Sequence, residues 1–144
     1  MSGTQSFCSF LVDGMCFGVE VQKVQEVLRF QELTHVPLAS PVVGGLMNLR
    51  GKIVATIDLR RRLGLPDRHE GARPMNVVVR ADEGTVSLLV DEICGVVEAR
   101  DDQFEPPPAM FDCEAQSLIE GTYTLDHCLL LVLNTAAATR ISPL

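Results

Sequence analysis

Tryptophan is absent from the sequence, and aromatic residues make up only 5% of its 144 residues. The six phenylalanines and one tyrosine are scattered, so they do not supply the stacking platform that single-stranded nucleic acids need. Basic residues are also few: 12 lysines and arginines stand against 19 acidic residues, for a formal net charge of -7. Such a field repels phosphate backbones and anionic membrane surfaces. The composition therefore argues against nucleic acid as a partner.

Long hydrophobic runs are absent as well. The longest, from Cys128 to Leu133, is the size of a strand, whereas a membrane-spanning helix needs roughly 20 apolar residues. The first residues, Met1 to Ser6, lack the basic start and the apolar block of a signal peptide. Apolar residues still form 47% of the chain, which is enough for a real core. We therefore expect one folded, cytoplasmic domain that does not insert into a membrane.

The common catalytic and metal-binding motifs are missing too. There is no G-x-S-x-G, G-x-x-x-x-G-K-[ST], G-x-G-x-x-G or H-E-x-x-H motif, and the five cysteines include no C-x-x-C pair. Asp91 and Glu92 are adjacent, so on a strand they would point to opposite faces rather than form a carboxylate pair. Arg60, Arg61 and Arg62 fit a solvated helix face better than a phosphate site in so acidic a chain. We expect no enzyme activity, no cofactor and no metal.

Short strand-like segments separated by turn residues dominate the chain. Asp13-Gly14 lies between Phe7–Val12 and Met15–Val19, the pattern of a hairpin with a tight turn. A second hairpin is predicted around residues 50–52, where Gly51 permits a left-handed turn and Asn48 can bond to neighbouring backbone. Further strands are expected at 46–49, 53–57, 75–81, 85–90, 93–98, 117–124 and 127–133. About ten short strands favour antiparallel barrels over an α/β sheet with long crossovers.

Two short helices are predicted between these strands. Val21, Val24 and Val27 recur at helical spacing with polar residues between them, which indicates an amphipathic helix of about two turns. Asp58 is placed to cap a second helix that extends through Leu63. On the pattern alone, the simplest interpretation of the valines is the buried stripe of a helix packed on its own barrel.

Three stretches occur in the order and spacing of one known family. They are Phe17-Gly18-Val19-Glu20-Val21, then Gly45-Leu46-Met47-Asn48-Leu49-Arg50-Gly51 with Ile57-Asp58-Leu59-Arg60, then Leu89-Val90-Asp91-Glu92-Ile93. From about Phe7 to Leu133 the sequence resembles the CheW family, the adaptors of bacterial chemosensory arrays. The N-L-R-G segment followed by I-D-L-R is the most specific part of this resemblance.

The resemblance implies a fold. It is all-β with short helices, and two five-stranded SH3-like β-barrels pack together, with the valine helix beside the cleft between them. Residues 1–144 would form a single CheW-like domain with subdomains at about 6–65 and 74–133, separated by the polar stretch 66–74. Whether the C-terminal segment returns to the first subdomain is left open.

The resemblance also implies a non-catalytic adaptor that couples chemoreceptors to a CheA-type histidine kinase. One surface, expected on the first subdomain without assigned residues, would bind the regulatory domain of the kinase. Another would bind the cytoplasmic tip of the receptor's helical hairpin, with Glu26 and Arg50 as a charged pair at its flank. Gly45 would let the partner backbone come close. This receptor groove would be lined by Cys8, Val21, Val24, Val27, Gly45 and Leu49.

Two alternatives stay open at this point. The same module could serve a non-chemotactic pathway that controls surface sensing, pili or a second messenger, because fold and pathway are separate properties. A less favoured alternative is a ligand-binding or thiol-reactive β-barrel that uses Cys8 or Cys94. That alternative requires a thiol with a lowered pKa, and neither cysteine has a basic residue or histidine within two positions.

Overall fold

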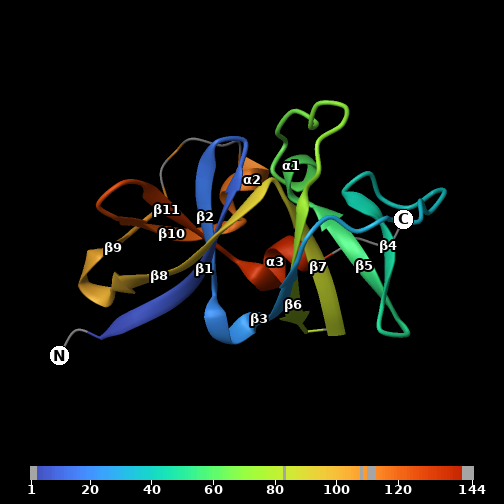
Figure 1. Cartoon of the computed structure of the whole chain (residues 1–144). Coiled ribbons are helices and arrows are strands. Elements are labelled where there is room, and N and C mark those ends of the chain that lie inside the picture. The colour runs from blue at the N-terminus through green and yellow to red at the C-terminus, as the bar shows by residue number, and fades with distance from the viewer. Residues whose placement is uncertain (1–2, 83, 108, 110–112, 141–144) are drawn as a thin grey trace.

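The computed structural model describes residues 3–82, 84–107, 109 and 113–140 (Figure 1). The strands are β1 (Thr4–Val12), β2 (Met15–Glu20), β3 (Val24–Leu28), β4 (Val43–Leu49), β5 (Lys52–Asp58), β6 (Met75–Ala81), β7 (Gly84–Val90), β8 (Glu92–Arg100), β9 (Phe104–Glu105), β10 (Ile119–Thr124) and β11 (Leu129–Leu133). The helices are α1 (Leu59–Arg62), α2 (Cys113–Gln116) and α3 (Thr135–Thr139), with single 3-10 turns at Val21–Lys23 and Asp101–Gln103. The expected all-β class with short helices is confirmed.

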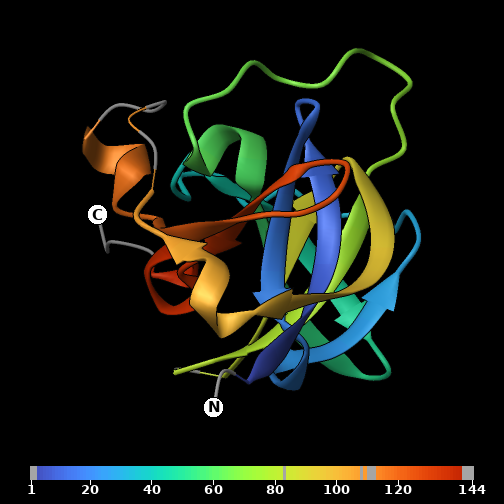
Figure 2. The same cartoon turned by 90° about the vertical axis from the view of Figure 1, so that its left-hand side faces the viewer.

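The strands form two sheets that lie side by side in Figure 1. The first sheet has the order β8-β1-β2-β11-β10-β9, and the second sheet has the order β3-β6-β7-β5-β4. The second sheet has the five strands that were expected, and the two-residue strand β9 brings the first to six. Figure 2 shows the segment between α1 and β6 as a long loop that arches over the sheets.

The expected subdomains, 6–65 and 74–133, would divide the strands between the two sheets at this loop. The structure divides them differently. The β1–β2 hairpin belongs to the first sheet, where β1 pairs antiparallel with β8 and β2 pairs parallel with β11. The second sheet consists of the strands between residues 24 and 90, so the loop 66–74 lies within it in chain order. Pairings such as Phe17 with Leu131 join residues far apart in sequence, and no local pattern encodes them.

The amphipathic helix predicted over the valines is wrong. A single 3-10 turn covers Val21–Lys23, and the chain then continues as β3, which pairs antiparallel with β6 from Val24 opposite Val79. β-branched valines favour the extended backbone, and the ladder with β6 satisfies backbone groups that an isolated helix of two turns would satisfy only marginally. Half-buried and exposed side chains therefore alternate along β3.

The predicted turn and cap residues are confirmed. Asp13 and Gly14 both have left-handed backbone, with φ of 52° and 77°, as a two-residue hairpin turn requires. At the β4–β5 turn Gly51 has a φ of 86°, and its N–H donates to Asn48 Oδ1 at 2.8 Å. Asp58 caps α1 by accepting a hydrogen bond from the backbone N–H of Arg60 at 3.0 Å.

The apolar core has three parts. A central cluster lies between the two sheets and includes Phe10 and Phe17 from the first sheet and Ile57 and Leu88 from the second. A second cluster around Phe7, Tyr123 and Leu130 belongs to the first sheet alone. A third cluster of Met47, Val54 and Val78 belongs to the second sheet alone. The central cluster joins the sheets into one body, because separating them would expose its apolar surface to water.

Buried polar side chains also occur in the second sheet. Ser87 Oγ donates to Asn76 Oδ1 at 2.9 Å, and Asn76 Nδ2 donates to the carbonyl of Arg29 at 3.4 Å. Thr56 lies next to Ser87 in the β5–β7 ladder and is fully buried. Its hydroxyl has no hydrogen-bond partner among the residues that the structure describes. A buried, unpaired hydroxyl costs stability.

Replacing Thr56 by valine is therefore expected to stabilise the protein. The Thr56→Val variant keeps the β-branched shape and removes the unpaired hydroxyl, so we expect the free energy of unfolding to rise by about 1 kcal/mol. Urea unfolding followed by circular dichroism measures it. Ser87→Ala is the matched comparison, since it breaks the bond to Asn76 and is expected to lower stability. A Thr56→Val variant less stable than the parent would contradict this account.

Candidate functional site

The three valines that were expected to form one helical stripe do not share one face. Val21 lies in the 3-10 turn, and Val24 and Val27 lie in β3. Val24 is half-buried and packs on the central cluster, so it contributes to the core between the sheets. Val21 and Val27 are exposed, at 38% and 46%. They lie on and just before a strand at the edge of the second sheet, where partners can approach. The core interpretation therefore holds for Val24, and the other two valines remain available to a partner.

The space between the sheets is filled by the protein's own side chains. The central cluster that occupies it draws fully buried residues from both sheets, with Val24 packed against them. The expected apolar cleft is therefore filled where this cluster lies. Val21, in the 3-10 turn, and Val27, in β3, are exposed outside it.

Glu26 and Arg50 form the ion pair that was expected beside these valines. Arg50 Nη1 donates to Glu26 Oε1 at 3.1 Å, and its Nη2 donates to Oε2, so the contact is bidentate. It links β3 to the β4–β5 turn. The Arg50 side chain is 68% exposed, so the pair itself is worth only about 0–1 kcal/mol. Its main effect is to fix the position of two charged groups at the edge of the sheet.

A shallow depression lies next to this ion pair. It has a volume of about 190 Å³ and is lined by Gln25, Leu49, Arg50, Lys52, Val54 and Thr85. Leu49 and Val54 belong to the third core cluster and provide apolar surface, while Arg50 and Lys52 provide positive charge. Thr85 Oγ1 donates to Gln25 Oε1 at 3.3 Å, which joins β3 to β7 beside the depression. Sequence reasoning identified Leu49 and Arg50 but missed the other four residues, because the depression combines three separate segments.

The other two groove residues are not available to a partner. Cys8 is 6% exposed and lies in the first sheet between Val19 and Val96, not in the sheet that carries the valines. Gly45 is buried with a φ of 149°, and a Cβ there would lie 2.8 Å from the carbonyl oxygen of Thr34. The backbone that approaches Gly45 is therefore the chain's own, through the bridge between Thr34 and Leu46. The expectation that Gly45 admits a partner backbone is wrong.

The three consecutive arginines of α1 each bond to a different segment, and only Arg61 is exposed as the expected solvated face would require. Arg60 bonds to Asp91 and to the carbonyl of Pro66, and Arg61 bonds to Asp67 and to the carbonyl of Pro41. Arg62 donates to the carbonyls of Ala137 and Arg140, which ties the C-terminal segment around α3 to α1. Successive residues of a helix point in different directions, so each arginine reaches a different segment.

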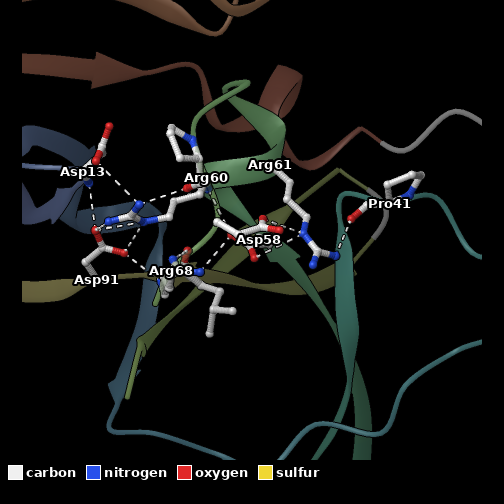
Figure 3. A network of polar contacts seen from close by, with 10 residues as sticks. Asp13, Pro41, Asp58, Arg60, Arg61, Arg68 and Asp91 are labelled. Atoms are coloured by element: carbon white, nitrogen blue, oxygen red, sulfur yellow. Dashed lines mark hydrogen bonds and ion pairs between the residues drawn. The ribbon is translucent and has the colours of Figure 1, made fainter. Parts of the chain in front are cut away.

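Figure 3 shows how Asp91 anchors a network of charges at the junction of the sheets. Arg60 Nη2 and Arg68 Nε each donate to its carboxylate at 2.7 Å, and the backbone N–H of Asp13 donates to it at the same distance. Arg68 also donates to Asp58 at 2.9 Å. The network joins the β1–β2 turn, α1, the 66–74 loop and the β7–β8 connection. The sequence analysis missed it because nothing local pairs Asp91 with Arg68, 23 residues away.

The network lowers the pKa of Asp91. Burial on its own would raise the pKa, but the hydrogen bonds from Arg60 and from the Asp13 backbone, with the positive charges of Arg68 and Arg60, outweigh it. The same hydrogen bond raises the pKa of Arg60. Asp91 is therefore ionised at neutral pH and acts as the counter-charge of two arginines. It is a structural residue rather than a member of a catalytic carboxylate pair.

Three of the cysteines, Cys8, Cys16 and Cys94, have a raised thiol pKa. Burial, followed by the nearby Cys94, raises the pKa of the Cys8 thiol. Burial, followed by the charges of Glu92 and Cys128, raises the pKa of Cys94. Burial, followed by the hydrogen bond with Cys128, raises the pKa of the Cys16 thiol to about 12. Reactive thiols need the opposite shift, so none of these three supports the thiol-reactive alternative.

The described part of the chain shows neither a metal-binding cluster nor a membrane-spanning helix. Its His, Cys, Asp and Glu side chains form no group of three that could hold a metal ion. Within the same residues, no helix has both the length and the apolar character that crossing a bilayer requires.

Comparison with known proteins gives consistent matches. The family model described as "CheW-like domain" matches residues 6–141. The "Chemotaxis protein CheW" of Bacillus subtilis is 27% identical over 128 residues, covering 89% of this chain and 82% of that protein. The "Protein FrzA" of Myxococcus xanthus is 28% identical over 115 residues, covering 80% and 72%.

A solved structure confirms the fold. The scaffolding protein TtCheW from Thermoanaerobacter tengcongensis superposes with a TM-score of 0.85 at 23% identity, covering 97% of this chain and 90% of that chain. The expected architecture of two packed SH3-like barrels is therefore correct. The two sheets described above are the walls of these barrels.

The Asp91 network predicts a pH-dependent loss of stability on mutation. Because the pKa of Asp91 is lower in the folded than in the unfolded chain, its ionised form stabilises the fold above the ordinary value of about 3.9, and this contribution disappears as the pH falls through the folded pKa. We expect Asp91→Asn to lose about 2 kcal/mol at pH 7. Urea unfolding at neutral and acidic pH measures the difference, which should shrink in acid. Asp82→Asn, in an exposed turn, is the control, and an equal loss there would refute a special role for Asp91.

The raised thiol pKa of Cys94 predicts slow alkylation despite its exposure. At neutral pH a smaller fraction of this thiol is ionised than in an unstructured peptide, so iodoacetamide should react with it more slowly. Peptide mapping by mass spectrometry follows the rate at Cys94 as a function of pH. Reaction faster than that of free cysteine would revive the thiol-reactive alternative.

Proposed function

This chain is a member of the CheW-like domain family, and we propose that it is a non-catalytic adaptor that couples chemoreceptors to a CheA-type histidine kinase. The family assignment carries the adaptor function, and the raised thiol pKa values of Cys8 and Cys94 argue against the thiol-reactive alternative. Its place of action is the cytoplasm, at receptor arrays that it joins through its partners. What remains is to assign surfaces to the partners.

The receptor-binding surface that we propose is the outer edge of the second sheet around β3. Its centre consists of Val21 and Val27, which are exposed although both are apolar. An amphipathic helical hairpin can cover such side chains with its own apolar stripe, while flanking charges set the register. The Glu26–Arg50 pair lies within this surface and has a fixed geometry. The exposed valines beside a fixed ion pair are the single observation that supports this assignment.

The kinase-binding surface stays without assigned residues. It was expected on residues 6–65, but these residues contribute strands to both sheets. The expectation therefore no longer selects one of the two barrels. We propose only that the regulatory domain of the kinase binds a surface separate from β3, because an adaptor must hold both partners at the same time.

Substitution of an exposed valine tests the receptor surface without disturbing the core. We expect Val27→Gln to weaken binding of a purified receptor hairpin-tip fragment by about 2 kcal/mol, or about thirtyfold, because an amide then replaces an apolar anchor. Isothermal titration calorimetry measures the affinity, and a pull-down with the kinase regulatory domain should be unchanged.

The control is the same substitution on the other sheet. Val96 in β8 is 66% exposed, and Val96→Gln should leave receptor binding unchanged. Val24→Gln is expected to lower the free energy of unfolding instead, because Val24 packs on the central cluster. Normal receptor binding by Val27→Gln, or a loss of binding in Val96→Gln, would overturn the assignment of the surface to β3.

A further inference from the structure

The charges of the chain are divided unevenly between the two sheets. Residues 21–90 contain every strand of the second sheet and hold ten of the twelve basic residues but seven of the nineteen acidic ones, for a formal charge of +3. The remaining residues contain the first sheet and carry a formal charge of -10, which together gives the -7 of the whole chain. The two halves of the molecule therefore present fields of opposite sign.

Positive charge is concentrated around the exposed valines of β3. Lys23 ends the 3-10 turn before β3, Arg80 donates to the carbonyl of Gln22 at 3.0 Å, and Lys52 lines the depression beside Arg50. Arg50 has Glu26 as its counter-charge. Lys23, Lys52 and Arg80 form no ion pair with any residue that the structure describes. Glu20 and Asp82 are the carboxylates near these cations that form no ion pair with a described residue, so three unpaired cations stand against two unpaired carboxylates around β3.

The first sheet has the opposite character. Its exposed carboxylates that form no ion pair with a described residue are Glu92, Glu98, Asp101, Glu105, Glu120 and Asp126. Arg100 is the single basic residue on the strands of this sheet, and Asp102 neutralises it at 2.7 Å. An acidic partner is repelled from this half and attracted to the other.

The depression at the β3 edge fits a single acidic side chain. Its volume of about 190 Å³ is below the roughly 300–1,000 Å³ of sites that hold a cofactor or a small-molecule ligand. Leu49 can pack against the methylene groups of a glutamate, and the ammonium group of Lys52 lies at the same depression to meet its carboxylate, beside the Arg50 that Glu26 already holds. The apolar surface and the ammonium group of Lys52, which forms no ion pair with a described residue, together favour an acidic side chain over a basic or neutral one.

We propose that the helical hairpin that docks on Val21 and Val27 carries acidic side chains beside its apolar stripe, and that one of them enters the depression and pairs with Lys52. This inference rests on the proposed receptor-binding function and adds the chemistry of the partner. The valines contribute the apolar contact, the depression fixes the register, and the opposite charges of the two sheets orient the adaptor before contact. Electrostatic attraction of this kind acts mainly on the association rate and weakens with salt.

Charge reversal at Lys52 tests the inference. With the full chain and the receptor hairpin-tip fragment, we expect Lys52→Glu to reduce affinity about tenfold, chiefly through slower association, and the difference to shrink at high sodium chloride concentration. Surface plasmon resonance at low and high salt measures both rates. Arg100→Glu makes the same charge change on the first sheet and should leave receptor affinity almost unchanged. Circular dichroism should show both variants folded.

A charge swap provides the second arm. Lysine replaces, one at a time, each acidic residue that flanks the apolar stripe of the fragment. One such replacement should weaken binding to the parent chain and restore binding to Lys52→Glu. Equal effects of Lys52→Glu and Arg100→Glu, or the absence of any rescue by the swaps, would overturn the inference. The neutral Val27→Gln variant separates the two proposals: if it fails to bind while Lys52→Glu binds normally, the receptor surface stands and the acidic partner does not.

Discussion

The arrangement of the two barrels depends on the central apolar cluster between the sheets, and the ionised carboxylate of Asp91 fixes the chain crossing beside it. The chain crosses from the second sheet to the first at this residue, between β7 and β8. Arg60 and Arg68 bind its two oxygens, and the turn of the β1–β2 hairpin is attached through the backbone of Asp13 (Figure 3). A charge held by two arginines in a partly buried position tolerates few alternative geometries, so the network fixes the crossing. The central apolar cluster then packs both sheets around it.

This arrangement bears on how the proposed adaptor would hold two partners. Because the central cluster packs the two sheets against each other, the proposed receptor surface lies outside that cluster. The edge strand β3 carries the exposed Val27 and Glu26, which pairs with Arg50, and Lys52 lies beside Arg50 at the neighbouring depression. Opposite net charges on the two halves give the molecule a polarity that its fold alone would not supply.

Much of the local structure could be predicted, and the failures have a common cause. The Asp13-Gly14 turn, the Asn48 contact to Gly51 and the Asp58 cap follow from short-range backbone chemistry, and all three are present. The helix predicted over Val21, Val24 and Val27 was wrong because the same spacing suits either a short helix or a turn followed by a strand. Pairing of β3 with β6 decides in favour of the turn and strand. Gly45 was identified as a close-approach residue, but Thr34 of the same chain is what approaches it.

Taken by itself, the sequence determined the all-β class, the turns and caps, the family resemblance and the Glu26–Arg50 pair that the resemblance implied. These properties depend on neighbouring residues or on motifs whose order survives in the linear chain. The tertiary structure decided which strands share a sheet, that Val24 is core whereas Val27 is exposed, and that Arg60 and Arg68 converge on Asp91. Each of these features requires contacts between segments that are distant in sequence. Such contacts form only when the whole chain folds, so no local pattern encodes them.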